Sequence, residues 1–282
     1  MALFIKIYVI LIIGRVIKMY GAIIGDLAGS IYEYDQINKV KEVKINNIIE
    51  DNSFYSDDTI LTIAVMDAML NNKDFEYYLK KYAKEYMNYK PNISPYFKTT
   101  FSPGFTKWVY SNEKENSKGN GAMMRISPIG YLSNSVDEVV EYSKLATIPS
   151  HNSKESVDCA TTIALIIYLA KNNYSKEEII KLLNLKYFYS PFKEFNYTCS
   201  STINNCLYAL FTSNNYEECI KKVISFGGDT DTNACIVGSM AEALYGIDKS
   251  LVDKAISKLP NEFVSVLEKG YQNIKKIKKV NR

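Results

Sequence analysis

Apolar residues recur at intervals of three and four along most of the chain. Between residues 58 and 70 this spacing predicts an amphipathic helix, because side chains three and four apart share one helix face. The same pattern predicts further helices over residues 75–89, 156–170, 175–183, 200–212, 216–226, 233–245, 250–259 and 262–274. No segment of the sequence alternates apolar and polar positions with the period of two that marks a half-buried strand. The chain is therefore predicted to be all-α.

Polar residues mark the starts of two helices. Ser135 followed by Glu138, and Ser175 followed by Glu178, match the capping box, in which the serine hydroxyl and the glutamate carboxylate each accept a backbone N–H of the other residue. Stretches rich in Asn, Ser and Gly at 88–104 and 112–121 predict loops. No linker divides the chain and no internal repeat is visible, so we predict a single domain.

The first residues differ from the rest of the chain. Residues 3–13 are apolar except for Lys6, about half the length that a membrane-spanning helix needs, and the basic stretch after them lacks a signal-peptide cleavage site. Met19 precedes the first segment that resembles folded protein. We expect residues 1–18 to be an extension outside the fold, followed by a domain over 19–274 and a basic tail, 275–282, that forms a solvated helix end. The alternative for 1–18 is a weak membrane or signal anchor.

Composition excludes several classes of protein. Lys plus Arg number 34 and Asp plus Glu 31, too balanced for a dedicated nucleic-acid binder, and we expect neither a nucleic-acid partner nor stable membrane insertion. The five cysteines are odd in number and lack Cys-x-x-Cys spacing, which favours a reducing, cytoplasmic location over a disulfide framework. Abundant Lys, Ile, Asn and Tyr indicate an AT-rich genome, bacterial or viral. With His151 as the single histidine, any metal must be held by oxygen atoms.

The first candidate for chemistry is the acidic cluster Ser56-Asp57-Asp58-Thr59. Ser56 is suited to cap the helix that follows, which puts both carboxylates in its first turn. Two interpretations remain open. Acidic residues at a helix N-terminus are favoured by the helix dipole alone, by about 0.3–1 kcal/mol each; alternatively, the cluster binds a metal ion.

The second acidic cluster is Gly-Gly-Asp-Thr-Asp-Thr-Asn at 227–233. Its glycines allow a tight turn, and the helix after it carries Ala, Gly and Ser on a face that can pack closely, so Asp229 and Asp231 are predicted to be buried. Buried neighbouring carboxylates repel unless a cation neutralises them. Carboxylate and hydroxyl oxygens suit Mg²⁺, Mn²⁺ or Ca²⁺, and four carboxylates from two helix N-termini would hold two ions. The spacing leaves open whether the two clusters meet.

Two further segments are candidates for the same site. Small residues between 21 and 29 predict a closely packed helix, on which Asp26 and Glu33, seven residues apart, would share one face. Gly119-Asn120-Gly121 is a glycine-rich loop entering a helix. Such a loop offers free backbone N–H groups for a phosphate, although it is also simply a common turn.

Together these motifs resemble the ADP-ribosylglycohydrolase family, from about Met19 to Gly246. The motifs, in chain order, are Gly-Asp-x-x-Gly-Ser-x-x-Glu at 25–33, Ser-Asp-Asp-Thr at 56–59, Gly-Asn-Gly-Ala-Met-Met-Arg at 119–125, Ser-His at 150–151 and Gly-Gly-Asp-Thr-Asp-Thr-Asn at 227–233. The last motif together with an upstream Asp-Asp-Thr is specific. The resemblance implies a compact orthogonal bundle of helices, which we expect to be a monomer. It also implies an enzyme that hydrolyses the glycosidic bond between ADP-ribose and an acceptor, releasing ADP-ribose.

The resemblance also implies roles for individual residues around two Mg²⁺ or Mn²⁺ ions at the bottom of a cleft. The implied metal ligands are Ser56, Asp57, Asp58, Asp229, Asp231 and Thr232. Glu33 stands where the family has a glutamate that contacts metal and guards the cleft. Those implied to bind the phosphates and the sugar are Ser117, Lys118, Gly119 and Asn120, with His151 lining the same pocket. The catalytic base is left open among Asp57, Asp58 and Glu33.

Two departures from the family pattern bear on specificity. Ser56 replaces the usual threonine and keeps the hydroxyl. Ser117 stands where some arginine-directed members carry an aspartate, which leaves the acceptor open between a protein side chain and a small conjugate. Two alternatives remain: a non-catalytic ADP-ribose-binding or structural family member, and an oxygen-ligated dinuclear phosphohydrolase. Release of ADP-ribose, or of phosphate from a phosphoester, would separate them.

Overall fold

The computed structural model describes residues 18–89 and 99–280, with side chains described as far as Ile274. Within these ranges there are helices and isolated bridges but no sheet, which confirms the all-α prediction. The elements are α2 (Gly21–Gly29), the 3-10 helix η1 (Glu33–Asp35), α3 (Asp57–Leu70), α4 (Phe75–Glu85), α5 (Pro103–Val109), α6 (Gly121–Met124), α7 (Ser127–Leu132), α8 (Val136–Thr147), α9 (Lys154–Lys171), α10 (Lys176–Leu182), α11 (Cys199–Phe211), α12 (Tyr216–Ser225), α13 (Thr230–Tyr245), α14 (Lys249–Ile256) and α15 (Asn261–Val280).

The helices predicted from apolar spacing are all present, with ends shifted by a few residues. At the C-terminus α15 continues past the predicted helix over 262–274 to Val280, into the tail that was expected to form a helix end. The short helices α5 and α7 were not predicted, because so few residues cannot establish a helical period. The helix expected after the loop at 119–121 is present as the four-residue α6. The capping box at Ser175 is confirmed. The one at Ser135 is half wrong, because Glu138 binds the backbone N–H of Asn134 instead.

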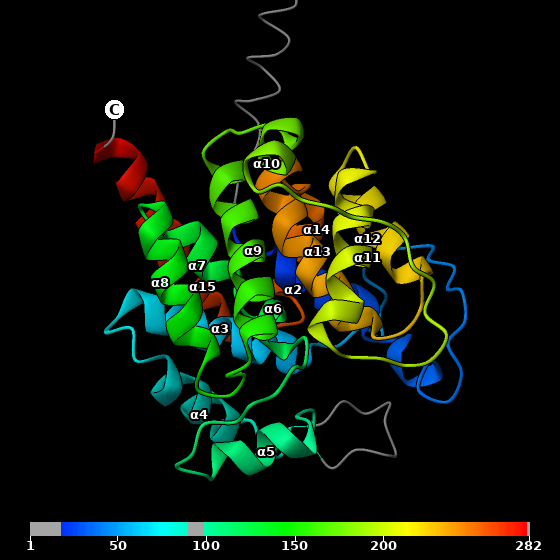
Figure 1. Cartoon of the computed structure of the whole chain (residues 1–282), viewed down its shortest axis with the longest axis horizontal. Helices are drawn as coiled ribbons and strands as arrows, with labels where there is room; N and C mark the ends of the chain where they lie inside the picture. Colours follow the sequence, from blue (N-terminus) through cyan, green and yellow to red (C-terminus); the bar gives the residue numbers. More distant parts are fainter. Residues whose placement is uncertain (1–17, 90–98, 281–282) are drawn as a thin grey trace, which may run out of the picture.

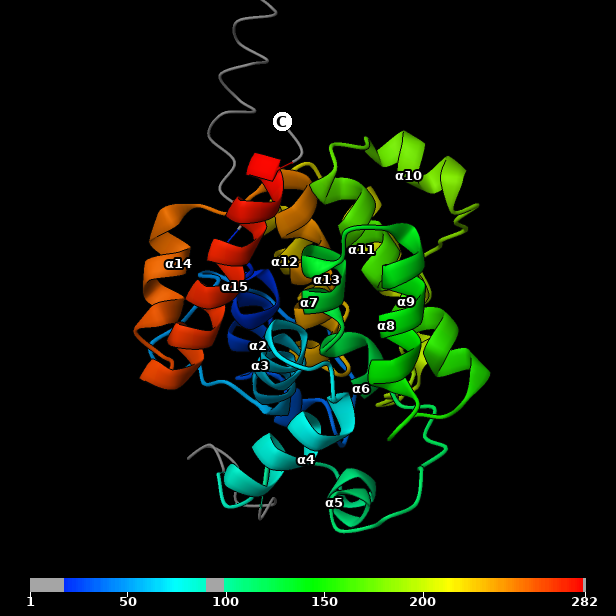
Figure 2. The same cartoon turned by 90° about the vertical axis from the view of Figure 1, so that its left-hand side faces the viewer.

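The centre of the molecule is a close contact between α2 and α13. A Cβ atom at Gly25 would lie 2.0 Å from the carbonyl oxygen of Ala234, and one at Gly29 would lie 2.2 Å from that of Thr230. Glycine is therefore required where the two backbones touch. In both views α2 and α13 lie in the middle (Figures 1 and 2). Figure 2 shows α14 and α15 on one side of them and α9 on the other. This contact puts the C-terminal end of α2 beside the first turn of α13.

A buried carboxylate binds the backbone at the start of the described chain. Glu242 of α13 accepts hydrogen bonds from the backbone N–H groups of Lys18, Met19 and Gly21, at 2.7, 2.8 and 2.6 Å. Burial raises the pKa of Glu242 to about 7. The proposed extension lies outside the described residues apart from Lys18, and the boundary at 18–19 stays a prediction. Among the helices that the structure describes, none is both long enough and apolar enough to cross a bilayer.

Candidate functional site

The second acidic cluster lies at the buried start of α13. Gly227 and Gly228 have φ of +72° and +76°, a conformation that side chains other than glycine rarely adopt, and they turn the chain into the helix. Asp229 occupies the N-cap position, yet its side chain makes no capping hydrogen bond. Its Oδ2 instead accepts from Nδ2 of Asn120 at 2.7 Å. The carboxylate is thus directed into the site and does not serve the helix terminus.

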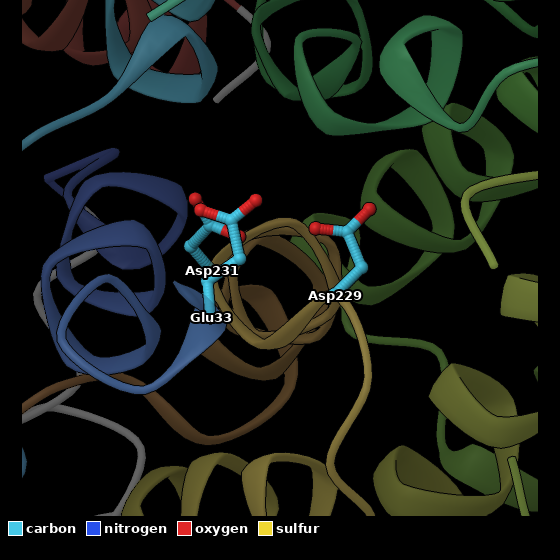
Figure 3. Close-up of side chains that lie close together, drawn as sticks. All are labelled: Glu33, Asp229 and Asp231. Atoms are coloured by element: carbon cyan, nitrogen blue, oxygen red, sulfur yellow. The ribbon is translucent and has the colours of Figure 1, made fainter. Parts of the chain in front are cut away.

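Three carboxylates gather at this helix start. One oxygen each of Glu33, Asp229 and Asp231 lies within 4.8 Å of the others, and Figure 3 shows the three groups pointing to the same side of α13. Glu33 comes from η1, so the prediction that it continues the helix of Asp26 is wrong. The helix ends at Gly29, which packs against the first turn of α13, and the hydroxyl of Ser30 donates to the carbonyl of Leu27 at 3.0 Å.

The first acidic cluster meets the second. Ser56 is the predicted N-cap of α3, and its Oγ accepts from the N–H of Asp58 at 3.2 Å. Oγ1 of Thr232, in the first turn of α13, donates to Oδ2 of Asp58 at 3.1 Å. Asp57 accepts from the hydroxyl of Thr100 at 3.1 Å. The fold therefore joins two helix N-termini that are far apart in the sequence, which the spacing had left open.

Asp26, which the sequence placed in a candidate segment without a specific role, belongs to this site. It is fully buried in α2, and its Oδ2 accepts from the N–H of Ser56 and from both the N–H and the hydroxyl of Thr59, at 2.9, 3.1 and 2.5 Å. It thereby fixes the first turn of α3 against α2. The sequence feature that could have indicated this role is an aspartate among small residues in a helix predicted to be closely packed.

The carboxylates repel one another in the absence of a cation. Burial, followed by repulsion from neighbouring carboxylates, raises the pKa of Asp57 to about 8 and that of Asp26 to about 7. The same causes hold the pKa values of Glu33, Asp58 and Asp231 well above their usual range. In the described part of the chain, no salt bridge neutralises any of them. A divalent cation is the group that would relieve this repulsion.

We expect the cation-free protein to become more stable as pH falls from about 8.5 to 6.5. The folded state binds more protons than the unfolded state in this range, because its carboxylate pKa values are raised, so the free energy of unfolding decreases as pH rises. Each unit by which one pKa is raised is worth about 1.4 kcal/mol at most. The measurement is the melting temperature in EDTA across this pH range.

Saturating Mg²⁺ or Mn²⁺ provides the control for this prediction, because a bound cation favours the charged carboxylates and should reverse or flatten the trend. Glu242 lies far from the cluster, so it contributes the same pH dependence of stability with and without cation. The difference between the melting-temperature curves in EDTA and in cation therefore reports on the cluster alone. A cation-free melting temperature that rises with pH would contradict the prediction.

The loop predicted to bind phosphate is tied to two other segments. The N–H of Asn120 donates to the carbonyl of Tyr197 at 2.7 Å, and the N–H of Cys199 donates to the carbonyl of Lys118 at 2.9 Å. The N–H of Gly119 is taken by Oγ of Ser117 at 3.1 Å, and the side chain of Lys118 is exposed. The backbone N–H groups of Gly119 and Asn120, which were expected to be free for a phosphate, therefore already donate hydrogen bonds within the protein.

His151 lies on the other side of this loop. Its Nε2 would be 3.3 Å from a Cβ atom at Gly121 and 3.5 Å from one at Gly119. The imidazole therefore packs closely over Gly121 and in van der Waals range of Gly119. The loop lies between His151 and Asp229, which Asn120 contacts, so the structure brings the predicted substrate residues and the acidic clusters to one site.

Comparison with known proteins agrees with this arrangement. A model of the ADP-ribosylglycohydrolase family matches residues 16–279. ADP-ribosylarginine hydrolase Tri1 of Pseudomonas putida (strain GB-1) is 23% identical over 268 residues, covering 81% of this chain and 70% of that protein. ADP-ribosylhydrolase ARH3 of Mus musculus is 25% identical over 182 residues, 56% of this chain and 49% of that protein. ADP-ribosyl-[dinitrogen reductase] glycohydrolase of Rhodospirillum rubrum is 26% identical over 153 residues, 51% of each.

The chain thus spans about half the length of the last two relatives. A solved structure, described as an ADP-ribosylglycohydrolase-related protein complex, superposes with a TM-score of 0.70 at 19% identity, over 92% of this chain and 97% of that one. At this identity the similarity shows a shared fold.

Proposed function

Because the chain belongs to the ADP-ribosylglycohydrolase family, we propose that it is a divalent-metal-dependent hydrolase that cleaves the bond between ADP-ribose and an acceptor. The observation that carries this proposal is the junction of two acidic helix N-termini, α3 and α13, beside a glycine loop. The acceptor is an ADP-ribosylated protein side chain or a small ADP-ribose conjugate. Two of the relatives are named for different substrates, ADP-ribosylarginine and ADP-ribosylated dinitrogen reductase, so the family alone does not choose between these.

The donor atoms fit a hard divalent cation. All are carboxylate or hydroxyl oxygens, which Mg²⁺ and Mn²⁺ prefer. Oδ1 of Asp58 and Oδ1 of Asp26 are buried without a hydrogen-bond partner in the described residues. We propose that Ser56, Asp57 and Asp58 hold one ion and that Asp229, Asp231 and Thr232 hold a second, with Glu33 beside the latter. Divalent cations held there would polarise the ribose hydroxyl groups and the attacking water.

Glu33 is the carboxylate best suited to take a proton from that water. Oδ2 of Asp58 already accepts from two hydroxyl groups, and Asp57 accepts from Thr100. The carboxylate of Glu33 makes no hydrogen bond to another described residue, and the residue is only half-buried, so this group remains available to a water molecule. Burial and the neighbouring carboxylates raise its pKa well above the usual range, which favours a group that holds a proton taken from water.

The same carboxylates would stabilise the transition state. Cleavage of a glycosidic bond develops positive charge at the anomeric carbon, and nearby negative groups favour that charge. The loop at Gly119 and Asn120 would orient the ribose and the phosphates, because Asn120 connects it directly to Asp229. Acceptor release and water attack would then occur on a sugar held between the loop and the acidic clusters.

The test is release of free ADP-ribose from defined substrates. The purified protein is incubated with ADP-ribosyl-arginine, an ADP-ribosyl-serine peptide and O-acetyl-ADP-ribose, each with Mg²⁺, with Mn²⁺ and with excess EDTA. We expect release from at least one substrate, loss of release in EDTA and recovery when the metal is restored.

Three outcomes would separate the alternatives. Full turnover in excess EDTA would contradict the metal dependence. ADP-ribose binding without turnover of any substrate would identify a non-catalytic binding protein. Release of phosphate from a phosphoester, without release of ADP-ribose, would identify a phosphohydrolase.

A further inference from the structure

Arg125 is a buried arginine without a carboxylate partner. It follows α6 and is 0% exposed, and no salt bridge among the described residues includes it. Its Nη2 donates to Oγ of Ser150 at 2.6 Å and to the carbonyl of Ala146 at 3.3 Å, while Nε and Nη1 have no partner in the described chain. Its guanidinium also lies over the ring of Phe105, with Cζ 5.9 Å from the ring centroid. Because burial of a guanidinium without a carboxylate is costly, the short hydrogen bond to Ser150 calls for a physical explanation.

Ser150 transmits the contact to His151. Its Oγ lies 2.9 Å from Nδ1 of His151 and, like Arg125, is shielded from solvent. Arginine has no acceptor, so the serine oxygen must accept from Arg125. The serine hydroxyl has one hydrogen, and Nδ1 is the acceptor within reach of it among the described residues. A buried hydroxyl hydrogen is normally satisfied, which requires Nδ1 to be the unprotonated nitrogen.

The proton of His151 is therefore on Nε2. Burial and the charge of Arg125 hold the pKa of His151 well below its usual range, so the ring is neutral. An isolated antiparallel bridge between His151 and Asn116 holds its backbone. Nε2 makes no hydrogen bond to a described residue. It faces Gly119 and Gly121, and a Cβ atom placed at these glycines would lie 3.5 and 3.3 Å from it, respectively.

We infer that Arg125 is a positioning residue: through Ser150 it holds His151 as a neutral imidazole whose Nε2–H points over the glycine loop and donates to an anionic phosphate oxygen of the substrate. That this substrate is an ADP-ribose compound rests on the proposed function. A positive charge and an N–H donor are needed at this position, because the nearby carboxylates repel the phosphate groups of the ligand. The buried charge of Arg125, which forms no salt bridge in the described chain, and one oriented N–H donor attract that phosphate.

The single histidine allows a direct test that does not depend on turnover. Protein labelled with ¹⁵N in histidine is studied by long-range ¹H–¹⁵N correlation near pH 7.5. We expect one neutral ring, unprotonated at Nδ1 and protonated at Nε2. A ring protonated at Nδ1, or an even mixture of the two tautomers, would overturn the inference whether or not the protein is a hydrolase.

Three variants connect the tautomer to binding. Ser150→Ala and Arg125→Met should each release the constraint on Nδ1, shift the ring toward a mixture of tautomers and weaken ADP-ribose binding by about tenfold, the usual size of a lost hydrogen bond to a charged group. The loss should appear in KM more than in kcat, because neither residue touches the acidic clusters. His151→Gln keeps an N–H donor near the position of Nε2 and should bind better than His151→Ala.

Ser143→Ala is the matched control, since Ser143, on α8, is also a fully buried serine but its hydroxyl has no described partner. It should leave both the histidine spectrum and the ADP-ribose affinity unchanged. If Arg125→Met does not fold, Ser150→Ala decides alone: an unchanged tautomer and unchanged affinity in that variant would refute the inference. Absence of ADP-ribose binding by the wild type, with the expected tautomer present, would instead count against the proposed function and against the ligand named here.

Discussion

Replacing Asp229 with asparagine should lower both turnover and divalent-cation affinity by orders of magnitude, while leaving the cation-free protein at least as stable as the wild type. The amide keeps the size of the side chain and can still accept from Asn120, which binds Oδ2 of Asp229 at 2.7 Å. It removes one charge from a buried group of carboxylates that raise one another's pKa, so repulsion falls. The measurements are calorimetric titration with Mn²⁺, ADP-ribose release, and the melting temperature in EDTA.

This variant separates metal binding from helix capping. Asparagine caps a helix about as well as aspartate, and the side chain of Asp229 makes no capping bond in any case. Near-normal Mn²⁺ affinity would therefore reject the ligand assignment. Asp58→Asn should behave like Asp229→Asn, and the double variant should lose little more than either, because residues that act as one unit are not additive. Asp137→Asn is the control, an exposed aspartate in the first turn of α8.

Replacing Gly25 with alanine should destabilise the fold by about 3 kcal/mol or more, which corresponds to a melting temperature roughly 6–12 °C lower. The new Cβ would lie 2.0 Å from the carbonyl oxygen of Ala234, and a backbone atom cannot rotate away as a side chain can. The helices α2 and α13 would have to separate. Because Asp26 follows Gly25 and holds the N–H groups of Ser56 and Thr59, activity should fall together with stability.

Gly104→Ala is the matched control for this substitution. Gly104 is also a helical glycine, but nothing lies within 4 Å of a Cβ placed there. Alanine should be neutral or slightly stabilising at that position, by up to about 1 kcal/mol. Equal melting temperatures for the Gly25 and Gly104 variants, measured by calorimetry, would show that the contact between α2 and α13 is not the close backbone contact described above.

The features that the sequence alone determined are local ones. The helix over residues 57–70, the Ser56 cap, the capping box at Ser175 and the buried start of α13 depend on residues a few positions apart, and helical spacing, hydroxyl caps and small side chains express them directly. The order of the motifs also indicated the family, because the acidic and glycine-rich segments are each short and contiguous.

Tertiary structure alone decided how these segments meet. Glu33 reaches the acidic cluster from a separate 3-10 turn, since α2 ends where Gly29 packs against α13. The bond between Thr232 and Asp58 joins residues 174 positions apart, and that between Asn120 and Asp229 joins residues 109 apart. Such contacts depend on how whole helices pack, and no local spacing encodes them. The repulsion that makes the site suited to a cation likewise arises only once packing has removed water from all of its carboxylates together.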